Sequence, residues 1–461
     1  MTGFRAMSGL AFSYARGAAG VVLVWFGLTI PILVTAVGSS VDIAQAYLVR
    51  ERLSHALDAA ALAAAASASE NNADIEKRVQ DFINVNYPPD KIGFTVDVDI
   101  DNQAETLYVG ATARLNTTFM KVFGKDKIDV FAETEVTKEV KAIEVVLVMD
   151  VTGSMTSYSG SKRRIDILKD SAKLFVETMF NRVKKKELIK IGLVPYSSSV
   201  NVGRYGLGKN PSGTNYDTAF VSNPFNIPYS ATDTAKWRGC VVEDDYPKDT
   251  LDHEGPWDMY RYCRNDNAAG TPIPNCDTTY NSRTKTYTAN RHQNYLCPET
   301  PVTPLTNDKT DLLASIKTLK AEGNTYGNIG MVWGYRLISP DFPFREAEPW
   351  SNEDWKKAII LMTDGVNQMH SYYSAHGPTA GSGITNRELD NRMLDVCEEM
   401  KDKGILVYTI TFDKDVDRNT KKLYEDCATQ PSMWYDAPNS DRLLEVYLTI
   451  AKELSNLHLS K

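Results

Sequence analysis

An uncharged segment near the N-terminus, residues 17–41, places the strongest constraint on how this chain can fold. Its centre reads VVLVWFGLTIPILV, and about 20 such apolar residues are enough to cross the hydrocarbon core of a bilayer as a helix. A cleaved signal peptide is the alternative, but its apolar region is normally shorter. No small-x-small cleavage site is evident between Val34 and Asp42. The sequence therefore predicts a retained transmembrane helix over residues 17–41.

The charges that flank this segment indicate its orientation. Arg5 and Arg16 precede it, and no acidic residue occurs before Asp42. The positive-inside rule then places residues 1–16 in the cytoplasm and the chain beyond residue 42 on the other side of the membrane. We therefore expect a single-pass membrane protein whose bulk is exported.

Composition and cysteine content agree with an exported globular protein. Hydrophobic residues make up 43% of the chain and charged residues 24%, as in proteins with a full core. The net charge of −8 argues against a nucleic-acid partner, because phosphate binding needs clustered Lys and Arg. An even number of cysteines in an exported chain suggests disulfides, and the lack of a CxxC pair argues against structural zinc. The candidates are Cys240, Cys263, Cys276, Cys297, Cys397 and Cys427, and the first four can pair in three ways.

Residues 42–142 predict a long helix followed by a small antiparallel sheet. The run VDIAQAYLVRERLSHALDAAALAAAA is rich in good helix formers, and we expect its helix to continue to about Asn86, just before Pro88 and Pro89. The segments GFTVDVDI, TLYVGATARL and KIDVFAETEV then alternate apolar and polar residues. This alternation is typical of half-buried antiparallel strands.

Residues 143–461 predict an α/β fold. The segment IEVVLVMD is apolar almost throughout, as expected of a central parallel strand. Strand-like and helix-like segments then alternate to the C-terminus, which predicts a doubly wound parallel sheet with helices on both faces. Residues 200–303 interrupt this pattern as a long, polar, aromatic-rich insertion that holds four of the cysteines. Long insertions of this kind are usually functional or disordered, and cross-linking by cysteines argues for order.

Oxygen-bearing side chains follow two of the predicted strands. Asp150 ends the strand IEVVLVMD and is followed by Thr152 and Ser154, Asp364 ends the strand AIILMTDG, and Thr325 lies in a loop before a helix. Ligands of doubly wound sheets bind outside the carboxyl ends of the strands, so we expect these five residues to meet. Carboxylate and hydroxyl oxygens suit a hard divalent cation. The alternative is that Asp150 and its neighbours only cap the following helix.

The segments EVVLVMDVTGSM and IILMTDG resemble the von Willebrand factor A domain and its metal-ion-dependent adhesion site, which uses Asp-x-Ser-x-Ser, a distant Thr and a later Asp. The resemblance implies a Rossmann-like fold that binds Mg²⁺, or alternatively Ca²⁺ or Mn²⁺. Ser154, Thr152 and Thr325 would bind the metal directly, and Asp150 and Asp364 directly or through water. An open coordination position would accept an exposed Asp or Glu of a protein ligand. The resemblance also suggests a disulfide between Cys397 and Cys427.

The N-terminal span, the Ala-rich run DAAALAAAA and the segment LNTTFMKVFG resemble TadE/TadG-type proteins of the Flp, or tight-adherence, pilus. TadG-like members of that group carry an A domain behind the anchor. The resemblance implies a bacterial inner-membrane protein with a periplasmic or pilus-associated bulk, a pilin-like helix-and-sheet stalk over residues 42–142, and pilus subunits among its partners. The expected function is metal-dependent adhesion or protein binding in pilus assembly or surface attachment, without catalysis.

Two other functions compete with this interpretation. One is a periplasmic scaffold for pilus assembly that has no metal dependence. The other is a metallohydrolase, which would need a general base. Only His370 and His376 are available near Asp364 in the sequence, and we expect both to be surface loop residues.

Two weaker patterns remain. The alternating Asp413, Asp415 and Asp417 resemble the start of a calcium loop, but the Gly and closing Glu are missing, and a solvated turn is expected. A set of aromatic residues in the insertion predicts either a recognition surface or a small disulfide-stapled core, with neither favoured. These residues are Tyr205, Tyr246, Trp257, Tyr260 and Tyr262.

Overall fold

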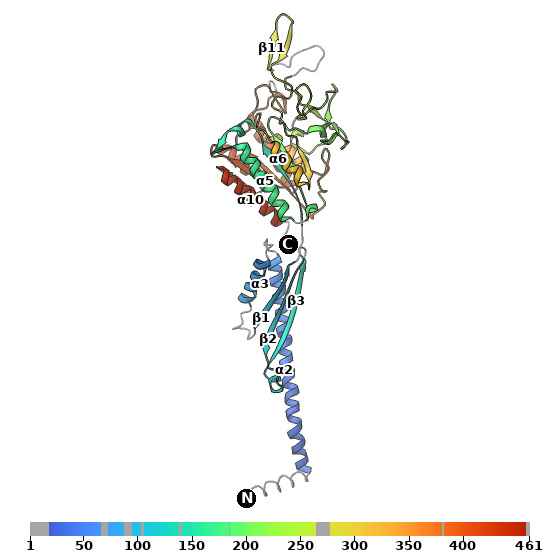
Figure 1. Cartoon of the computed structure of the whole chain (residues 1–461), viewed down its shortest axis with the longest axis vertical. Helices are drawn as coiled ribbons and strands as arrows, with labels where there is room; N and C mark the ends of the chain where they lie inside the picture. The colour runs from blue at the N-terminus through green and yellow to red at the C-terminus, as the bar shows by residue number, and fades with distance from the viewer. Residues whose placement is uncertain are drawn as a thin grey trace. The chain divides into compact units, whose positions relative to one another are not determined.

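The computed structural model (Figure 1) describes most of the chain, which divides into two compact units, the second beginning at Lys141. The described residues are 18–65, 72–86, 95–102, 106–137, 141–183, 185–263, 277–379 and 382–457. The first unit holds those up to Thr137, and the second holds those from Lys141.

Helix α2 (Ala18–Ala65) passes through two environments. From Val22 to Val41 its large apolar side chains are exposed, whereas from Val49 onward one face is buried against the rest of the unit. The buried residues recur every three or four positions, as on one face of a helix; they are Val49, Leu53, Ala56, Leu57, Ala60, Ala61 and Ala64. The stretch Val22–Ala64 is long and apolar enough to cross a membrane, which agrees with the span expected from the sequence.

The remainder of the first unit is a sheet with a second helix. Strands β1 (Thr95–Asn102), β2 (Thr106–Asn116) and β3 (Lys127–Thr137) are antiparallel in the order β1-β2-β3, with Met120–Phe123 forming the short helix η1 between β2 and β3. Alternate side chains of β2, from Leu107 to Ala113, are buried against α2. The predicted antiparallel strands are therefore present.

One expectation for this unit is wrong: no single helix runs to about Asn86. Helix α3 (Asn72–Asn86) is a separate element that packs beside α2 and β1 (Figure 1). Its Val79 and Ile83 are buried in the same core as the Ala-rich half of α2, which a straight continuation of α2 would not allow. Residues 66–71, between the two helices, read ASASEN, in which Ala and Glu favour a helix and Ser and Asn favour it less.

The second unit is built on a six-stranded sheet in the order β13-β7-β4-β14-β17-β18. All neighbours are parallel except β13, which is antiparallel to β7. Every residue of the central strand β4 is buried. The strands are β4 (Ala142–Asp150), β7 (Ile189–Tyr196), β13 (Thr303–Thr306), β14 (Trp355–Thr363), β17 (Leu406–Phe412) and β18 (Trp434–Ala437).

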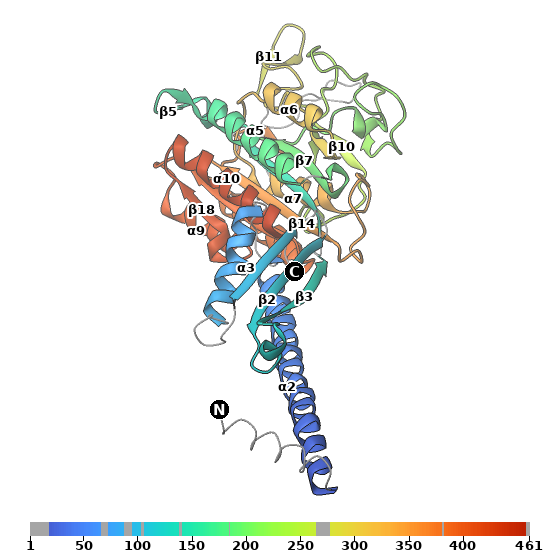
Figure 2. The same cartoon turned by 60° about the horizontal axis from the view of Figure 1, so that its bottom comes forward.

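Helices cover both faces of this sheet and create two hydrophobic cores. One face carries α5 (Arg164–Arg182), α6 (Lys309–Thr318) and α10 (Ser440–Leu457), with α5 and α10 side by side (Figure 2). The other face carries α7 (Gly327–Ile338), α8 (Asn386–Asp402) and α9 (Arg418–Cys427). Cys397 on α8 and Cys427 on α9 form a disulfide, the pairing that the resemblance suggested. The mixed α/β class predicted from the sequence is confirmed.

The insertion between β7 and β13 has little regular structure but a buried interior. Cys240 and Cys297 form a disulfide across 57 residues; Cys263 is disulfide-bonded, and Cys276 lies outside the described residues. Of the aromatic residues singled out in the sequence, Trp257, Tyr260 and Tyr262 are buried, Tyr205 packs against the core, and Tyr246 is 54% exposed. They therefore serve mainly as core. The short strands of the insertion are β8 (Val221–Ser222), β9 (Val241–Val242), β10 (Trp257–Met259), β11 (Thr278–Asn281) and β12 (Thr286–Ala289).

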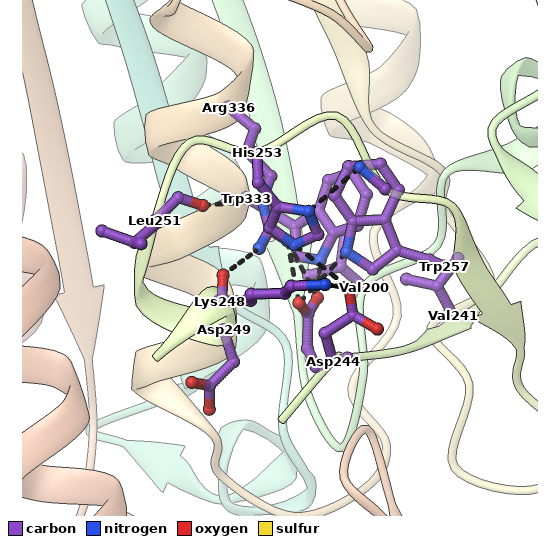
Figure 3. A network of polar contacts seen from close by, with 12 residues as sticks. Val200, Val241, Asp244, Lys248, Asp249, Leu251, His253, Trp257, Trp333 and Arg336 are labelled. Carbon is purple, nitrogen blue, oxygen red and sulfur yellow. Dashed lines mark hydrogen bonds and ion pairs between the residues drawn. The ribbon is translucent and has the colours of Figure 1, made fainter. Parts of the chain in front are cut away.

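A buried ion pair attaches the insertion to α7 (Figure 3). Arg336 of α7 lies 2.9 Å from a Glu243 carboxylate oxygen, and both side chains are fully buried. The guanidinium stacks near the rings of Trp257 and Trp333 and donates to the carbonyls of Lys248 and Leu251, at 3.3 Å each. Removing one partner of such a desolvated pair strongly destabilises a fold, so the pair ties the insertion to α7.

Candidate functional site

The two predicted aspartates lie at the carboxyl edge of the sheet because their strands are parallel neighbours. In the register of β4 and β14, Met149 pairs with Met362. Asp150 is the last residue of β4, and Asp364 directly follows β14, so both lie at the same edge. This is the edge at which open parallel sheets bind ligands.

Hydrogen bonds connect four of the five predicted residues. The Thr152 N–H donates to Asp150 Oδ1 at 2.9 Å, and the hydroxyls of Thr152 and Ser154 are 2.9 Å apart. The Ser154 hydroxyl donates to Asp364 Oδ1 at 2.5 Å. Asp150, Thr152 and Asp364 are buried, whereas Ser154 is exposed, so the group opens to solvent on the Ser154 side.

Thr325, the fifth residue, lies on a loop held against this group by its backbone. The Gly153 N–H donates to the Gly323 carbonyl and the Glu322 N–H to the Val151 carbonyl, both at 2.8 Å. Thr325 is 7% exposed. Within the part of the chain that the structure describes, its hydroxyl makes no hydrogen bond to the other four residues. The backbone of the loop that carries Thr325 is thus held against Val151 and Gly153, and, among the described residues, the Thr325 side chain is not hydrogen-bonded to the group.

The sequence analysis missed a cation that belongs to the site. Arg164, the first residue of α5, donates to Asp364 Oδ2 at 2.9 Å and lies 3.0 Å from Asp413 Oδ1. Asp413 follows β17, the next parallel strand beyond β14, and is 4% exposed. The expected solvated turn is therefore wrong at Asp413, because its carboxylate is buried against Arg164. The signal available in the sequence was that Asp413, like the other two aspartates, ends an apolar strand.

Burial shapes the protonation of the two central carboxyls. Burial, followed by the charge of Asp364, raises the pKa of Asp150 to about 7, although hydrogen bonds from Thr152 and Thr363 oppose the shift. Burial also raises the pKa of Asp364, opposed by Ser154 and Arg164. The Thr363 hydroxyl donates to Asp150 Oδ2 at 2.8 Å. Burial thus disfavours the ionised form of both carboxyls. A cation bound at this edge would stabilise that ionised form.

The two histidines that a catalytic function would need lie elsewhere. His376 was expected at the surface, but its side chain is 4% exposed and its Nε2 lies 3.3 Å from Asn328 Nδ2. Burial lowers its pKa to about 3. His370 Nδ1 accepts hydrogen bonds from the backbone N–H groups of Tyr372 and Tyr373. Neither ring has a contact with the five candidate residues among those described.

The donor chemistry of the site is mixed. Among the described residues, no group of three or more His, Cys, Asp or Glu side chains is placed to hold a metal ion. A cation at this edge would therefore depend on the hydroxyls of Thr152 and Ser154 as much as on the carboxylates. Such oxygen sets, completed by water, suit Mg²⁺ or Ca²⁺ better than zinc.

A comparison with protein families finds a match near the N-terminus. Residues 20–67 match the model of a TadE/G-like Flp pilus-assembly family. No curated protein matches the chain.

Several solved structures are similar over larger stretches. The pilus adhesin SpaC from Lactobacillus rhamnosus GG is 14% identical with a TM-score of 0.38, covering 78% of this chain and 34% of SpaC. The vWF domain of the type V pili tip protein Mfa5 from Porphyromonas gingivalis is 13% identical with a TM-score of 0.37, covering 70% and 97%. A mutant of the PilB minor pilin from Streptococcus sanguinis is 12% identical with a TM-score of 0.36, covering 79% and 80%. This chain thus spans about a third of the length of SpaC.

Proposed function

We propose that this protein is a membrane-anchored binding subunit of a Flp-type pilus system. Its second unit would be a doubly wound von Willebrand factor A domain that binds an acidic group of a partner through a divalent cation. The observation that carries the proposal is the hydrogen-bonded series Asp150, Thr152, Ser154 and Asp364 at one sheet edge, open to solvent at Ser154.

The charge of the site supports a divalent cation. Three carboxylates (Asp150, Asp364 and Asp413) and one guanidinium (Arg164) give a net charge of −2 when all are ionised. The Thr152, Ser154 and Asp364 oxygens would hold the ion, with Thr325 and Asp150 in support. The ion would supply a positive charge that an incoming Asp or Glu can bind. Mg²⁺ is our first choice, with Ca²⁺ and Mn²⁺ as alternatives.

The N-terminal match supports the cellular setting. A TadE/G-like segment at residues 20–67 and an apolar helix long enough to cross a membrane are consistent with an anchored pilus component. We propose that residues 1–16 are cytoplasmic, that the bulk is periplasmic or pilus-associated, and that pilus subunits or an acidic surface protein are the partners. We propose no catalytic activity, since His370 and His376 have their contacts elsewhere.

Calorimetry of the detergent-solubilised chain with Mg²⁺, Ca²⁺ and Mn²⁺ tests cation binding directly. Ser154→Ala removes one hydroxyl from the site and should weaken binding at least tenfold, or about 1.4 kcal/mol. Ser157→Ala is the matched control, because Ser157 is an exposed serine three residues further on. No binding heat with any cation in the unmodified chain would contradict the proposal.

A cellular assay tests the consequence of binding. Asp150→Ala, in cells that export the folded chain, should reduce surface attachment or pilus display to the level seen with a chelator. Attachment and display unchanged by both treatments would rule out a metal-dependent role.

One observation favours a second candidate, a scaffold that needs no metal. The Arg164 guanidinium already neutralises Asp364 and Asp413 at 2.9 and 3.0 Å, so the site could be held together by protein charges alone. Under this alternative the calorimetry shows no cation binding, while Arg164→Met impairs folding or export in chelator and cation alike.

A further inference from the structure

An apolar loop in the first unit is exposed to a degree that its own unit does not explain. It connects β2 to β3 through η1 (Met120–Phe123). Val122 is 80% exposed, Phe123 63% and Phe119 37%. Clustered apolar side chains of this kind usually mark a protein or membrane contact.

The loop is tied to the membrane-spanning helix by a single carboxylate. Asp42 of α2 accepts hydrogen bonds from three consecutive backbone N–H groups, those of Thr118 at 3.1 Å, Phe119 at 2.8 Å and Met120 at 2.7 Å. Asp42 is 3% exposed. Three charge-assisted bonds to one buried carboxylate fix the height of the loop along α2.

A glycine in α2 receives the ring of Phe119. A Cβ atom at Gly38 would lie 2.4 Å from the Phe119 ring, so only glycine allows this approach. Glycine inside a helix is less favourable than alanine, and the contact with Phe119 offsets that cost. Gly38 is one helical turn before Asp42, on the side of the predicted span, and one turn rises about 5.4 Å.

The same contact creates an open apolar groove on the helix. Its volume is about 310 Å³, and its lining is almost purely apolar. The lining residues are Leu33, Val34, Val37, Gly38, Val41 and Phe119. Five of these six belong to α2, and all but Phe119 lie within residues 17–41, the segment that the bilayer is expected to surround. The surface of the groove is therefore continuous with the lipid-facing surface of the span.

We propose that this loop is a second membrane contact: Phe119, Val122 and Phe123 insert into the interfacial region of the leaflet where α2 leaves the bilayer. A phospholipid acyl chain fills the groove beside Phe119. Lys121 and Lys125, both exposed on the same loop, bind the phosphate groups above it, since basic residues near an anionic leaflet are attracted to it. The inference rests on α2 crossing the membrane, and it is independent of the candidate cation site.

Lipid is favoured over a second copy of the chain as the occupant. The groove merges with Leu33, Val34 and Val37, which are 56–66% exposed and which lipid must cover if α2 spans the bilayer. The flanking lysines suit phosphate. A helix that leaves the membrane with a rigid apolar loop at its side is anchored at a defined height and tilt, since interfacial contacts set both.

Spin labelling of the full chain in phosphatidylcholine–phosphatidylglycerol liposomes tests the proposal. A label at Val122→Cys should collide readily with oxygen and poorly with a water-soluble nickel chelate. A label at Glu135→Cys, an exposed position on β3 eight residues from the loop end of the strand, should show the reverse. A label at Leu28→Cys, mid-span, reports whether α2 itself is inserted, and the unsubstituted chain gives the labelling background.

Equal exposure of Val122→Cys and Glu135→Cys to the nickel chelate, with Leu28→Cys protected, would overturn the proposal. Dipolar broadening between labels at Val122→Cys would also overturn it, because a second copy would then cover the loop.

In the Val122→Cys background, Gly38→Leu should displace Phe119 and raise the nickel accessibility of the label severalfold. Gly27→Leu is the matched control, since a Cβ at Gly27 meets nothing within 4 Å. A lipid signature that survives Gly38→Leu unchanged would contradict the seating of Phe119 on Gly38.

Discussion

Arg164 has the strongest influence on the charge of the candidate site, because its guanidinium contacts two buried carboxylates from neighbouring strands. It lies 2.9 Å from Asp364 and 3.0 Å from Asp413. Without Arg164, the site would carry one more negative charge in a place with little water to screen it. The residue therefore stabilises the cation-free protein and opposes cation binding at the same time.

Arg164→Met separates these two effects. In chelator, the loss of a partner from a buried ion pair should lower the free energy of unfolding by about 3 kcal/mol. With the extra negative charge, cation affinity should rise on the order of tenfold. Chemical denaturation and calorimetry measure the two quantities. Arg163→Met, at the exposed neighbouring position, should change neither, and a stable Arg164→Met variant with unchanged affinity would contradict this account.

Asp252, away from the candidate site, should make the stability of the protein depend on pH. Burial raises its pKa to about 6, opposed by the hydrogen bond from Ser339. Because the folded-state pKa exceeds the ordinary value of 3.8, its contribution to stability is present at low pH and is lost as pH rises through about 6. Asp252→Asn should therefore gain stability over the unmodified chain as pH rises from 4 to 7, by about 1–2 kcal/mol after allowance for partial solvent screening.

Thermal unfolding across this pH range, followed by tryptophan fluorescence, measures the Asp252 effect. Asp245→Asn serves as the control, because Asp245 is an exposed aspartate of the same insertion. A constant difference between Asp252→Asn and the unmodified chain at every pH would show that the carboxyl does not titrate as described.

Sequence reasoning located Asp150 and Asp364 because both end apolar strands, and parallel strands end at one edge. It could not find Arg164, since the reach of a long side chain from the start of α5 depends on how that helix packs. For the same reason it assigned Asp413 to solvent. Where the backbone alone sets the position of a side chain the prediction succeeded, and where a tertiary contact sets it the prediction failed.

The disulfide between α8 and α9 should contribute measurably to the stability of the second unit. Cys397 and Cys427 are 30 residues apart, and closing a loop of that length in the unfolded chain is worth about 2–4 kcal/mol. Replacing both cysteines by alanine should lower the free energy of unfolding by that amount, as measured by chemical denaturation. Both cysteines are fully buried in a hydrophobic core, so a Cys397→Ser and Cys427→Ser pair should be less stable still, owing to the buried hydroxyls.

Hydrophobic periodicity predicted the strands that bury one face or both. The apolar run of β4 became the fully buried central strand, and the alternating segments became β1, β2 and β3. The insertion gave no such signal, because the contacts that hold it, among them the Cys240–Cys297 disulfide and the Glu243–Arg336 pair, join residues far apart in sequence. The separation of α2 from α3 was missed because helix propensity changes only slightly across the sequence between them.

The second unit has what it needs to fold alone. The hydrophobic cores on the two faces of its sheet are formed, among the described residues, by side chains from residue 143 onward. The ion pairs at the candidate site also lie within it. A soluble fragment of residues 141–461 should therefore show a cooperative thermal transition and a near-UV circular dichroism spectrum typical of packed aromatic side chains.

Cation binding to that fragment can be measured as a rise in its thermal stability. A cation that binds only the folded state at 100 times its Kd adds about 2.7 kcal/mol to the free energy of unfolding. For a domain of this size, that corresponds to a rise in Tm on the order of 5 °C. Asp364→Asn should abolish the rise, because it removes the carboxylate bonded to both Ser154 and Arg164. Asp426→Asn, on the exposed side of α9, should retain it. A rise in Tm of the same size in both variants would place the cation elsewhere on the fragment, and the site at the edge of β4 and β14 would then be structural.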